Sequence, residues 1–294
     1  MSEAIEHPVQ ITLDELPRYS SWPKRLLALE HYAIRRKTEA EVLREYQDDK
    51  WGSLLARVRC LDNPTLLDVE RANADLAATA PCYHAGNFYL ASNHWMLNLH
   101  LDLYAEVLTP YLENASCVVE LGAGFGSKLF GLGFREAFSK MPLIAAEYTQ
   151  SGRDLISILA KVSGKPVAIG QCDFWKLQIS DITIPENAVI FTSCALHYVS
   201  ELSFDLVAFI SRLKPRVVVH FEPCYEHYDA ESFHGLMCRR YVQLNDYTVN
   251  LAAVIQAGRD REGISVRTRL NVMGSNPFLP ISVVEWVPSA RSRS

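Results

Sequence analysis

Beyond about residue 112, the hydrophobic residues fall into short apolar runs separated by stretches with helical spacing. The runs lie at residues 116–119, 143–148, 166–174, 188–193, 216–221, 263–273 and 281–286. Short runs rich in β-branched side chains and bounded by turn residues are typical of buried strands. Helical spacing follows the first run at 128–132 and separates the fourth and fifth runs at 204–213. This alternation predicts an α/β fold in which the last two runs form a closing hairpin.

The first 110 residues follow a different pattern. Helical periodicity at 23–36, 38–46 and 93–111 predicts an N-terminal helical cap or lid. The aromatic segment 81–90 either lines a substrate pocket or packs between the cap and the sheet. The polar first twenty residues either form a flexible arm or fold over the active site. We therefore predict three regions: a cap at 1–110, a cofactor domain at 111–288 and a disordered tail at 289–294.

An acidic residue and three alternating glycines end the first apolar run. They are Glu120, Gly122, Gly124 and Gly126. Glycine lets the backbone turn sharply and approach a ligand, because no Cβ stands in the way. Strand, glycine turn and helix, in this order, are the context in which a glycine motif binds a nucleotide. We expect a nucleotide-cofactor loop here; a plain tight turn from strand to helix is the alternative.

The next two apolar runs also end in carboxylates. Glu147 lies about 20 residues beyond the glycine loop, where a dinucleotide-type site places the acceptor for ribose hydroxyls. Asp173 and Phe174 end the third run, and they are suited to hydrogen-bond and to stack on an adenine. For Asp173, a helix N-cap is an equally strong interpretation. Ser193, at the end of the fourth run, completes the predicted cofactor-binding set.

Together these features resemble a class I S-adenosylmethionine-dependent methyltransferase over about residues 112–288. The resemblance depends on the loop Glu120–Gly126, on Glu147, on Cys172-Asp173 and on the strands that follow. It implies a Rossmann-like sheet of seven strands in which strand 7 is antiparallel and lies between strands 5 and 6. It also implies S-adenosylmethionine as cofactor, with the three loop glycines beside its methionine moiety.

Candidate catalytic groups follow strand 4, because ligands in open α/β sheets gather at the carboxyl ends of strands. His197 matches the catalytic histidine in the Leu-His-Asp-Trp-Ser-Asp segment of small-molecule O-methyltransferases. Tyr198 and Val199 replace the Asp-Trp of that segment. His197 is therefore a candidate base, and a hydrogen-bonded structural histidine is the alternative.

Strand 5 leads into a second set of acidic and imidazole side chains. Imidazole and carboxylate together suit one divalent transition metal such as Zn, Fe or Ni. We predict His197, Glu222 and His227 as its ligands, with Glu226 and His234 as further catalytic candidates. The alternative is that these groups hydrogen-bond a polar substrate or one another.

This constellation resembles the metal-dependent α-keto acid C-methyltransferases. A keto acid that chelates a metal has a more acidic C3 proton, because the ion stabilises the enolate. A base then removes the proton, and the carbanion attacks the sulfonium methyl group.

A possible substrate follows from one spacing. Glu222 and Glu231 are nine positions apart, like the paired glutamates that hold guanidinium in protein arginine methyltransferases. The spacing favours a guanidino keto acid, 5-guanidino-2-oxopentanoate. Tyr83 and Arg239 are further substrate-binding candidates; Arg239 meets a substrate carboxylate or is a helix-surface charge.

Composition narrows the range of partners. The chain of 294 residues has a formal net charge of −5 and no block of lysine or arginine. A small-molecule substrate is therefore expected, and nucleic acid is disfavoured. There is no apolar run of membrane length and no signal-peptide core. Seven cysteines without Cys-x-x-Cys spacing predict reduced thiols and a cytoplasmic location. Helical N-terminal regions support dimers in related enzymes, which favours a homodimer.

Three other functions remain open at this point. A metal-independent O- or N-methyltransferase would use His197 as its base. A cofactor-binding partner protein would use the helical cap for association and would not catalyse a reaction. A nicotinamide oxidoreductase would use the glycine loop for a different nucleotide.

Overall fold

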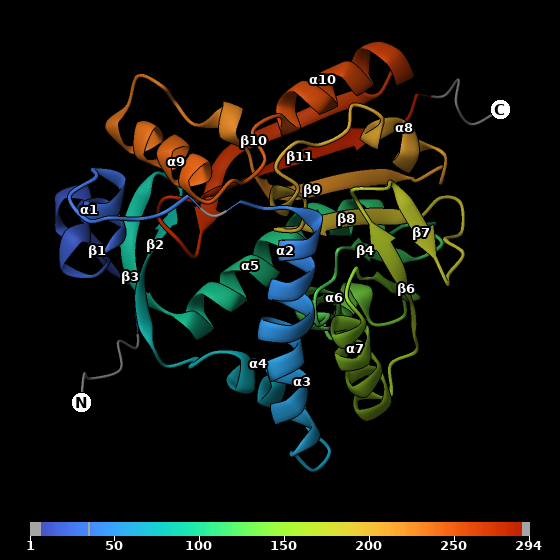
Figure 1. Ribbon diagram of the computed structural model, residues 1–294. Coiled ribbons are helices and arrows are strands. Elements are labelled where there is room, and N and C mark those ends of the chain that lie inside the picture. The colour runs from blue at the N-terminus through green and yellow to red at the C-terminus, as the bar shows by residue number, and fades with distance from the viewer. Residues whose placement is uncertain (1–6, 35, 290–294) are drawn as a thin grey trace.

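The protein folds around one mixed β-sheet (Figure 1). The computed structural model describes residues 7–34 and 36–289. Within these residues the sheet has eleven strands, in the order β1-β3-β2-β10-β11-β9-β8-β4-β5-β6-β7. The strands are β1 (Val9–Ile11), β2 (Thr79–His84), β3 (Asn87–Ser92), β4 (Val118–Leu121), β5 (Leu143–Ala146), β6 (Val167–Asp173), β7 (Gln178–Ser180), β8 (Val189–Ser193), β9 (Val217–Pro223), β10 (Ser265–Gly274) and β11 (Ile281–Val287).

The centre of the sheet is parallel. β4, β5, β6, β8 and β9 pair in parallel, and β11 lies antiparallel between β9 and β10. The antiparallel position expected for strand 7 is therefore present. The expected total of seven strands is wrong, because β1–β3 extend the sheet beyond β10 and β7 extends it beyond β6.

Helices cover both faces of the sheet. They are α1 (Trp22–Leu26), α2 (Glu39–Arg44), α3 (Trp51–Arg59), α4 (Leu66–Asn73), α5 (Asn93–Leu108), α6 (Ser127–Gly133), α7 (Gln150–Ser163), α8 (Leu206–Ser211), α9 (Phe233–Leu244) and α10 (Leu251–Glu262). In Figure 1, α8 and α10 lie on one side of the central strands, and α5, α6 and α7 lie on the other.

Two hydrophobic cores result from this layering. Side chains alternate along a strand, so Val118 belongs to the core under α5–α7 and Val119 to the core under α8 and α10. A strand buried on both faces needs apolar residues at consecutive positions. This need explains why each central strand begins with consecutive apolar residues.

The N-terminal region is not purely helical, contrary to the prediction. The aromatic segment 81–90 forms most of the β2–β3 hairpin, and Met273 of β10 pairs with His84 of β2. Ala85 and Gly86, both with positive φ (46° and 86°), make the two-residue turn. The predicted helix 93–111 is confirmed as α5, with a short 3-10 turn after it.

The predicted helix 23–36 is wrong beyond Leu26. Ala28 adopts a left-handed φ of 57°, which an α-helix cannot continue through. The predicted helix 38–46 begins correctly, because Thr38 and Glu41 form a reciprocal capping box. α2 then passes into a π-helical turn, Glu45–Lys50, and on into α3.

Part of the predicted N-terminal arm is ordered into the sheet, since β1 pairs with β3. Residues 1–6 of the arm and 290–294 of the predicted tail lie outside the described residues. In the part of the chain that the structure describes, no helix has both the length and the apolar character needed to cross a membrane.

Candidate active site

A cavity of about 520 Å³ lies at the carboxyl ends of β4, β5, β6 and β8. Its other walls come from α5 and from the segment Tyr46–Trp51. Small-molecule sites have volumes of roughly 300–1,000 Å³. The position is the one at which open α/β sheets bind their ligands.

The glycine loop forms part of the cavity floor. Gly122 has a φ of 75°, and a Cβ built there would lie 2.5 Å from the Cβ of Ala195. Gly122 and Gly124 line the cavity, as predicted for a cofactor loop. Gly126 does not, because it is buried against Phe130 and Ile156. Its lack of a Cβ allows close packing against side chains of α6 and α7.

Glu120 lines the cavity as a buried carboxyl group. Its Oε2 accepts a hydrogen bond of 3.1 Å from the backbone N–H of Leu129. Burial raises the pKa of Glu120 to about 8, although the charge of Lys128 and the bond from Leu129 oppose this rise. A cationic group bound beside Glu120 would favour its ionised form.

Glu147 joins β5 to the glycine loop. Its Oε2 accepts a 2.8 Å bond from Gly124 N–H, and its Oε1 accepts from the N–H and Oγ1 of Thr149 at 3.0 and 2.7 Å. Burial raises the pKa of Glu147, and these hydrogen bonds oppose the rise. The carboxylate lies at the cavity wall, where the ribose contact was predicted. That contact stays a prediction.

The end of β6 is only partly as predicted. Phe174 lines the cavity with Trp175, and Ser193 lines it from β8. Asp173 does not: its Oδ1 accepts from the backbone N–H groups of Trp175 and Lys176, at 2.9 and 3.0 Å. The carboxylate therefore stabilises the turn after β6. A turn, and not a helix, directly follows Asp173, so the alternative of a helix N-cap is also wrong, and the carboxylate caps this turn instead.

His197 is buried behind the cavity wall and is not among the lining residues. Its Nδ1 faces Oε2 of Glu222 at 3.5 Å, and its ring packs between Tyr198 and Tyr247. Oε1 of Glu222 accepts from the N–H groups of Ala195 and Leu196. The pair thus holds the turn after β8, and its placement does not support a base or substrate contact in the cavity.

The predicted metal ligands do not come together. The Nδ1 atom of His227 lies 3.0 Å from Oγ of Ser282. Across residues 7–34 and 36–289, there is no group of three His, Cys, Asp or Glu side chains that could hold a metal ion. The described residues therefore do not fit the expected Zn, Fe or Ni site.

The two further catalytic candidates have structural partners outside the cavity. Glu226 accepts a 3.1 Å bond from the N–H of Ala253, in the first turn of α10, where a carboxylate stabilises the helix N-terminus. His234 lies 2.7 Å from the carbonyl of Pro277 and stacks on Tyr83, with ring centroids 5.2 Å apart. Neither His234 nor Tyr83 lines the cavity.

The remaining substrate-binding predictions also fall elsewhere. Arg239 donates from Nε to the carbonyl of Tyr228 at 2.8 Å, and its guanidinium lies 4.9 Å from the ring centre of Tyr225. Glu231 is exposed before α9. The spacing of Glu222 and Glu231 therefore does not build a guanidinium clamp, since Glu222 is buried behind the cavity wall.

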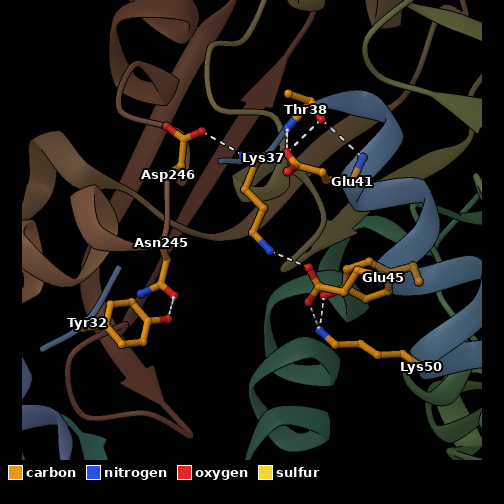
Figure 2. Close-up of polar contacts among 9 residues, drawn as sticks. Tyr32, Lys37, Thr38, Glu41, Glu45, Lys50, Asn245 and Asp246 are labelled. Atoms are coloured by element: carbon orange, nitrogen blue, oxygen red, sulfur yellow. Dashed lines mark hydrogen bonds and ion pairs between the residues drawn. The ribbon is translucent and has the colours of Figure 1, made fainter. Parts of the chain in front are cut away.

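The N-terminal segment that covers the cavity is held by a polar network (Figure 2). Lys37 is buried, and its backbone N–H donates to Asp246 at 2.8 Å. Its Nζ forms an ion pair with Glu45, and Glu45 also pairs with Lys50 at 2.9 Å. Tyr32 donates to Asn245 at 3.1 Å on the same face. The network anchors the π-helical turn.

That turn forms part of an aromatic wall of the cavity, which the sequence pattern did not predict. Tyr46 contacts both Trp51 and Tyr198, with centroid distances of 5.6 and 4.8 Å, and Trp51 contacts Phe125 of the glycine loop at 5.2 Å. All four rings belong to lining residues. A π-helical turn often marks a functional site, but it is defined by its backbone hydrogen bonds and not by a residue pattern.

Helix α5 forms the opposite wall. His100 is buried, lines the cavity and forms a 2.7 Å hydrogen bond from Nδ1 to the carbonyl of Met96. Burial, helped by the charge of Lys128, lowers the pKa of His100 to about 3. One turn later, the hydroxyl of Tyr104 bonds Oγ of Ser193 at 2.8 Å. In the sequence, these two residues could have been found as a histidine and a tyrosine four positions apart in an apolar helix.

Lys128, in the first turn of α6, brings a positive charge to the cavity. Its charge lowers the pKa of both Glu120 and His100, which places its ammonium group near both. Among the described residues, no carboxylate forms an ion pair with Lys128. The sequence pattern predicts only that Lys128 begins a helix.

Neither a protein-family model nor a curated protein matches this chain. Among solved structures, it is similar to magnesium protoporphyrin IX methyltransferase from Synechocystis PCC 6803 with bound SAH. The identity is 14%, the match covers 86% of this chain and 100% of the other, and the TM-score is 0.52.

Two weaker similarities are to PigF with SAH and to mitomycin 7-O-methyltransferase. For PigF the identity is 12%, with 84% of this chain and 72% of the other covered and a TM-score of 0.42. For the mitomycin enzyme the identity is 16%, with 82% of this chain and 67% of the other covered and a TM-score of 0.41. At these sequence identities, structural similarity establishes only the fold. The comparison with the Synechocystis enzyme supports that fold assignment. The chain has a methyltransferase-like α/β fold.

Proposed function

We propose that the protein transfers a methyl group from S-adenosylmethionine to a small molecule. The observation that carries this proposal is the cavity floored by Gly122 and Gly124 and flanked by the buried carboxyl groups of Glu120 and Glu147. The methyltransferase-like fold supports it.

The residues at this end of the cavity fit such a cofactor. A Cβ at Gly122 would fill the space against Ala195, so the glycine keeps the floor open. Glu120 is a buried acid that has no cationic ion-pair partner among the described residues, and it is suited to receive an amino group. Glu147 offers carboxylate oxygens for hydroxyl groups.

The cofactor would supply a methyl group made electrophilic by the sulfonium charge. The rings of Tyr46, Trp51 and Tyr198 exclude water from the cavity and present aromatic faces that attract a cation. Tyr104, through its bond to Ser193, keeps α5 close to the end of β8. The protein's main contribution in this scheme is orientation of donor and acceptor.

C3-methylation of an α-keto acid such as 5-guanidino-2-oxopentanoate is the finer form of the proposal. The cavity offers a cation, Lys128, for a carboxylate and an imidazole, His100, for a proton. Because the predicted metal ligands are apart, we propose no metal-dependent step. A hydroxyl or amine acceptor would use the same two side chains.

Isothermal titration calorimetry with S-adenosylhomocysteine tests the cofactor assignment. We expect saturable binding that raises the melting temperature of the protein, whereas NAD gives neither effect. Methyl transfer from labelled S-adenosylmethionine is then measured with α-keto acids, phenols and amines. No binding of S-adenosylhomocysteine would overturn the proposal, and binding without transfer to any acceptor would indicate a cofactor-binding protein instead.

A further inference from the structure

The cavity has two chemically different ends. One end is built from strand termini and contains Gly122, Gly124, Glu147 and Phe174. The other is built from helices α4, α5 and α6, and its lining includes Glu70, Asn73, Met96, His100 and Lys128. Only the first end resembles a cofactor site, so the second end is the place to look for the group that accepts the methyl.

Lys128 is the cation of the helical end. It is half-buried, and its charge acts on Glu120 of the strand end, which burial holds mainly protonated at neutral pH by raising its pKa to about 8. Glu70, the acid of the helical end, accepts a hydrogen bond from Ser127. Among residues 7–34 and 36–289, the ammonium group of Lys128 has no ion-pair partner, although it is partly removed from water. A ligand carboxylate would provide one.

His100 has a defined tautomer. Its Nδ1 lies 2.7 Å from the Met96 carbonyl, which can only accept, so the proton is on Nδ1. Nε2 is then the unprotonated nitrogen, and it has no hydrogen-bond partner among the described residues. Burial and the Lys128 charge lower the pKa of His100 to about 3. A carboxylate bound to Lys128 would offset that charge and make Nε2 more basic.

We propose that Lys128 binds a carboxylate of the methyl acceptor and that His100 takes the proton which the acceptor loses. The inference rests on the proposed function and names its substrate class: small carboxylates that carry an acidic hydroxyl or C–H group. The acceptor's O–H or C–H bond breaks and its proton moves to Nε2. The electron pair left behind bonds to the methyl carbon, while the S–CH₃ bonding pair stays on sulfur as the sulfonium becomes a thioether. His100 later returns its proton to water.

The carboxylate preference is tested with two matched probes, 3,4-dihydroxybenzoate and catechol, titrated into the protein saturated with S-adenosylhomocysteine. We expect the carboxylate-bearing probe to bind about tenfold more tightly or better. Lys128→Gln should remove this preference. Lys161→Gln, at an exposed position of α7, should keep it. Equal affinities of the wild-type protein for the two probes would overturn the proposal.

The carboxylate of the cofactor's methionine moiety is the other possible partner of Lys128. Titrations of S-adenosylhomocysteine and of 5′-methylthioadenosine, which lacks that moiety, separate the two sources. If Lys128→Gln weakens only S-adenosylhomocysteine, Lys128 serves the cofactor and the acceptor assignment is wrong. If the wild-type protein binds neither nucleoside, the proposed function itself fails.

The base assignment is tested with His100→Gln. We expect unchanged affinity for both probes and a hundredfold or greater fall in kcat for methyl transfer to 3,4-dihydroxybenzoate, with KM nearly constant. His94→Gln, one exposed position on the same helix, is the control. A His100→Gln kcat within threefold of the wild-type value rules out the base role, and so does a wild-type protein that binds the probe without methylating it.

Discussion

Two walls of the cavity, the strand-end wall and the wall formed by Tyr46–Trp51, differ in how they are built. The strand-end wall is made of backbone turns and buried carboxyl groups from β4 and β5, which are central strands paired on both sides. The wall formed by Tyr46–Trp51 comes from a π-helical turn that is held by the Lys37–Glu45–Lys50 network (Figure 2). The first wall is rigid by sheet pairing, whereas the second depends on a few polar contacts. Substitutions in the two walls should therefore have different effects on ligand affinity and on stability.

The largest effect on cofactor binding is expected from Gly122→Ala. The added Cβ would lie 2.5 Å from Ala195, at a φ of 75°. We expect at least a hundredfold loss of affinity for S-adenosylhomocysteine, measured by calorimetry, because the loop must move. Gly164→Ala is the matched control: it has a similar φ of 65° and nothing within 4 Å of the new Cβ. Equal losses in both variants would show that strain alone, and not the cavity floor, is responsible.

Glu120→Gln should change how stability depends on pH. Burial raises the pKa of Glu120 from 4.5 to about 8, so between these values the folded state keeps a proton that the unfolded state has lost. The free energy of unfolding of the wild-type protein therefore falls as pH rises through this window, by at most about 1.4 kcal/mol per unit from this group. Glutamine removes that contribution.

Urea denaturation at pH 5 and pH 8 measures the difference. We expect the stability of Glu120→Gln relative to wild type to increase by about 3–4 kcal/mol between the two pH values. Glu186→Gln, in an exposed ion pair, should show no such trend. If the stability difference between Glu120→Gln and wild type were the same at both pH values, the raised pKa of Glu120 would be contradicted.

Lys37→Met tests the wall that depends on polar contacts. Lys37 is 6% exposed and Glu45 is 29% exposed, so the pair is only partly removed from water. Removing Lys37 should cost about 1–2 kcal/mol of unfolding free energy, less than a fully buried pair would. Affinity for S-adenosylhomocysteine should also fall, because Tyr46 and Trp51 lose their support. Lys24→Met, in an exposed pair with Glu30, should change neither property.

The smallest effect concerns the contact that joins α5 to β8. Tyr104→Phe removes the 2.8 Å bond to Ser193 and should cost about 1 kcal/mol of stability. A double-mutant cycle with Ser193→Ala isolates the bond. Tyr228→Phe, which loses a 2.9 Å bond to Pro280 away from the cavity, should cost a similar amount without changing ligand affinity. If Tyr104→Phe and Tyr228→Phe changed ligand affinity equally, the contact between α5 and β8 would not shape the site.

Most of the central sheet was predictable because its signals are local. The strands at Val118, Leu143 and Val189 begin with apolar residues at consecutive positions, as burial on both faces requires. The order of strand, glycine turn and helix predicted a ligand-binding loop at Gly122 and Gly124. Glu120 and Glu147 were placed at the cavity because each sits at or just after a strand end.

Side-chain direction after a strand was not predictable. His197 also follows a strand, but the short 3-10 turn Leu196–Tyr198 directs its ring towards Glu222. Asp173 bonds the backbone of the turn that follows it, and His227 faces Ser282. Such directions depend on turn geometry and on the partners available in the fold, so spacing could not distinguish a metal ligand from a structural contact.

By itself, the sequence determined the strands and the glycine turn that build the strand-end wall of the cavity, because each is encoded by neighbouring residues. Tertiary structure alone decided the other walls of the cavity. It brings Trp51, His100 and Lys128, from three separate helices, around one volume. It also decided that β2 extends the sheet, through the pairing of His84 with Met273. The physical reason is that these contacts join residues far apart in the chain, and no local pattern records which distant surfaces will pack together.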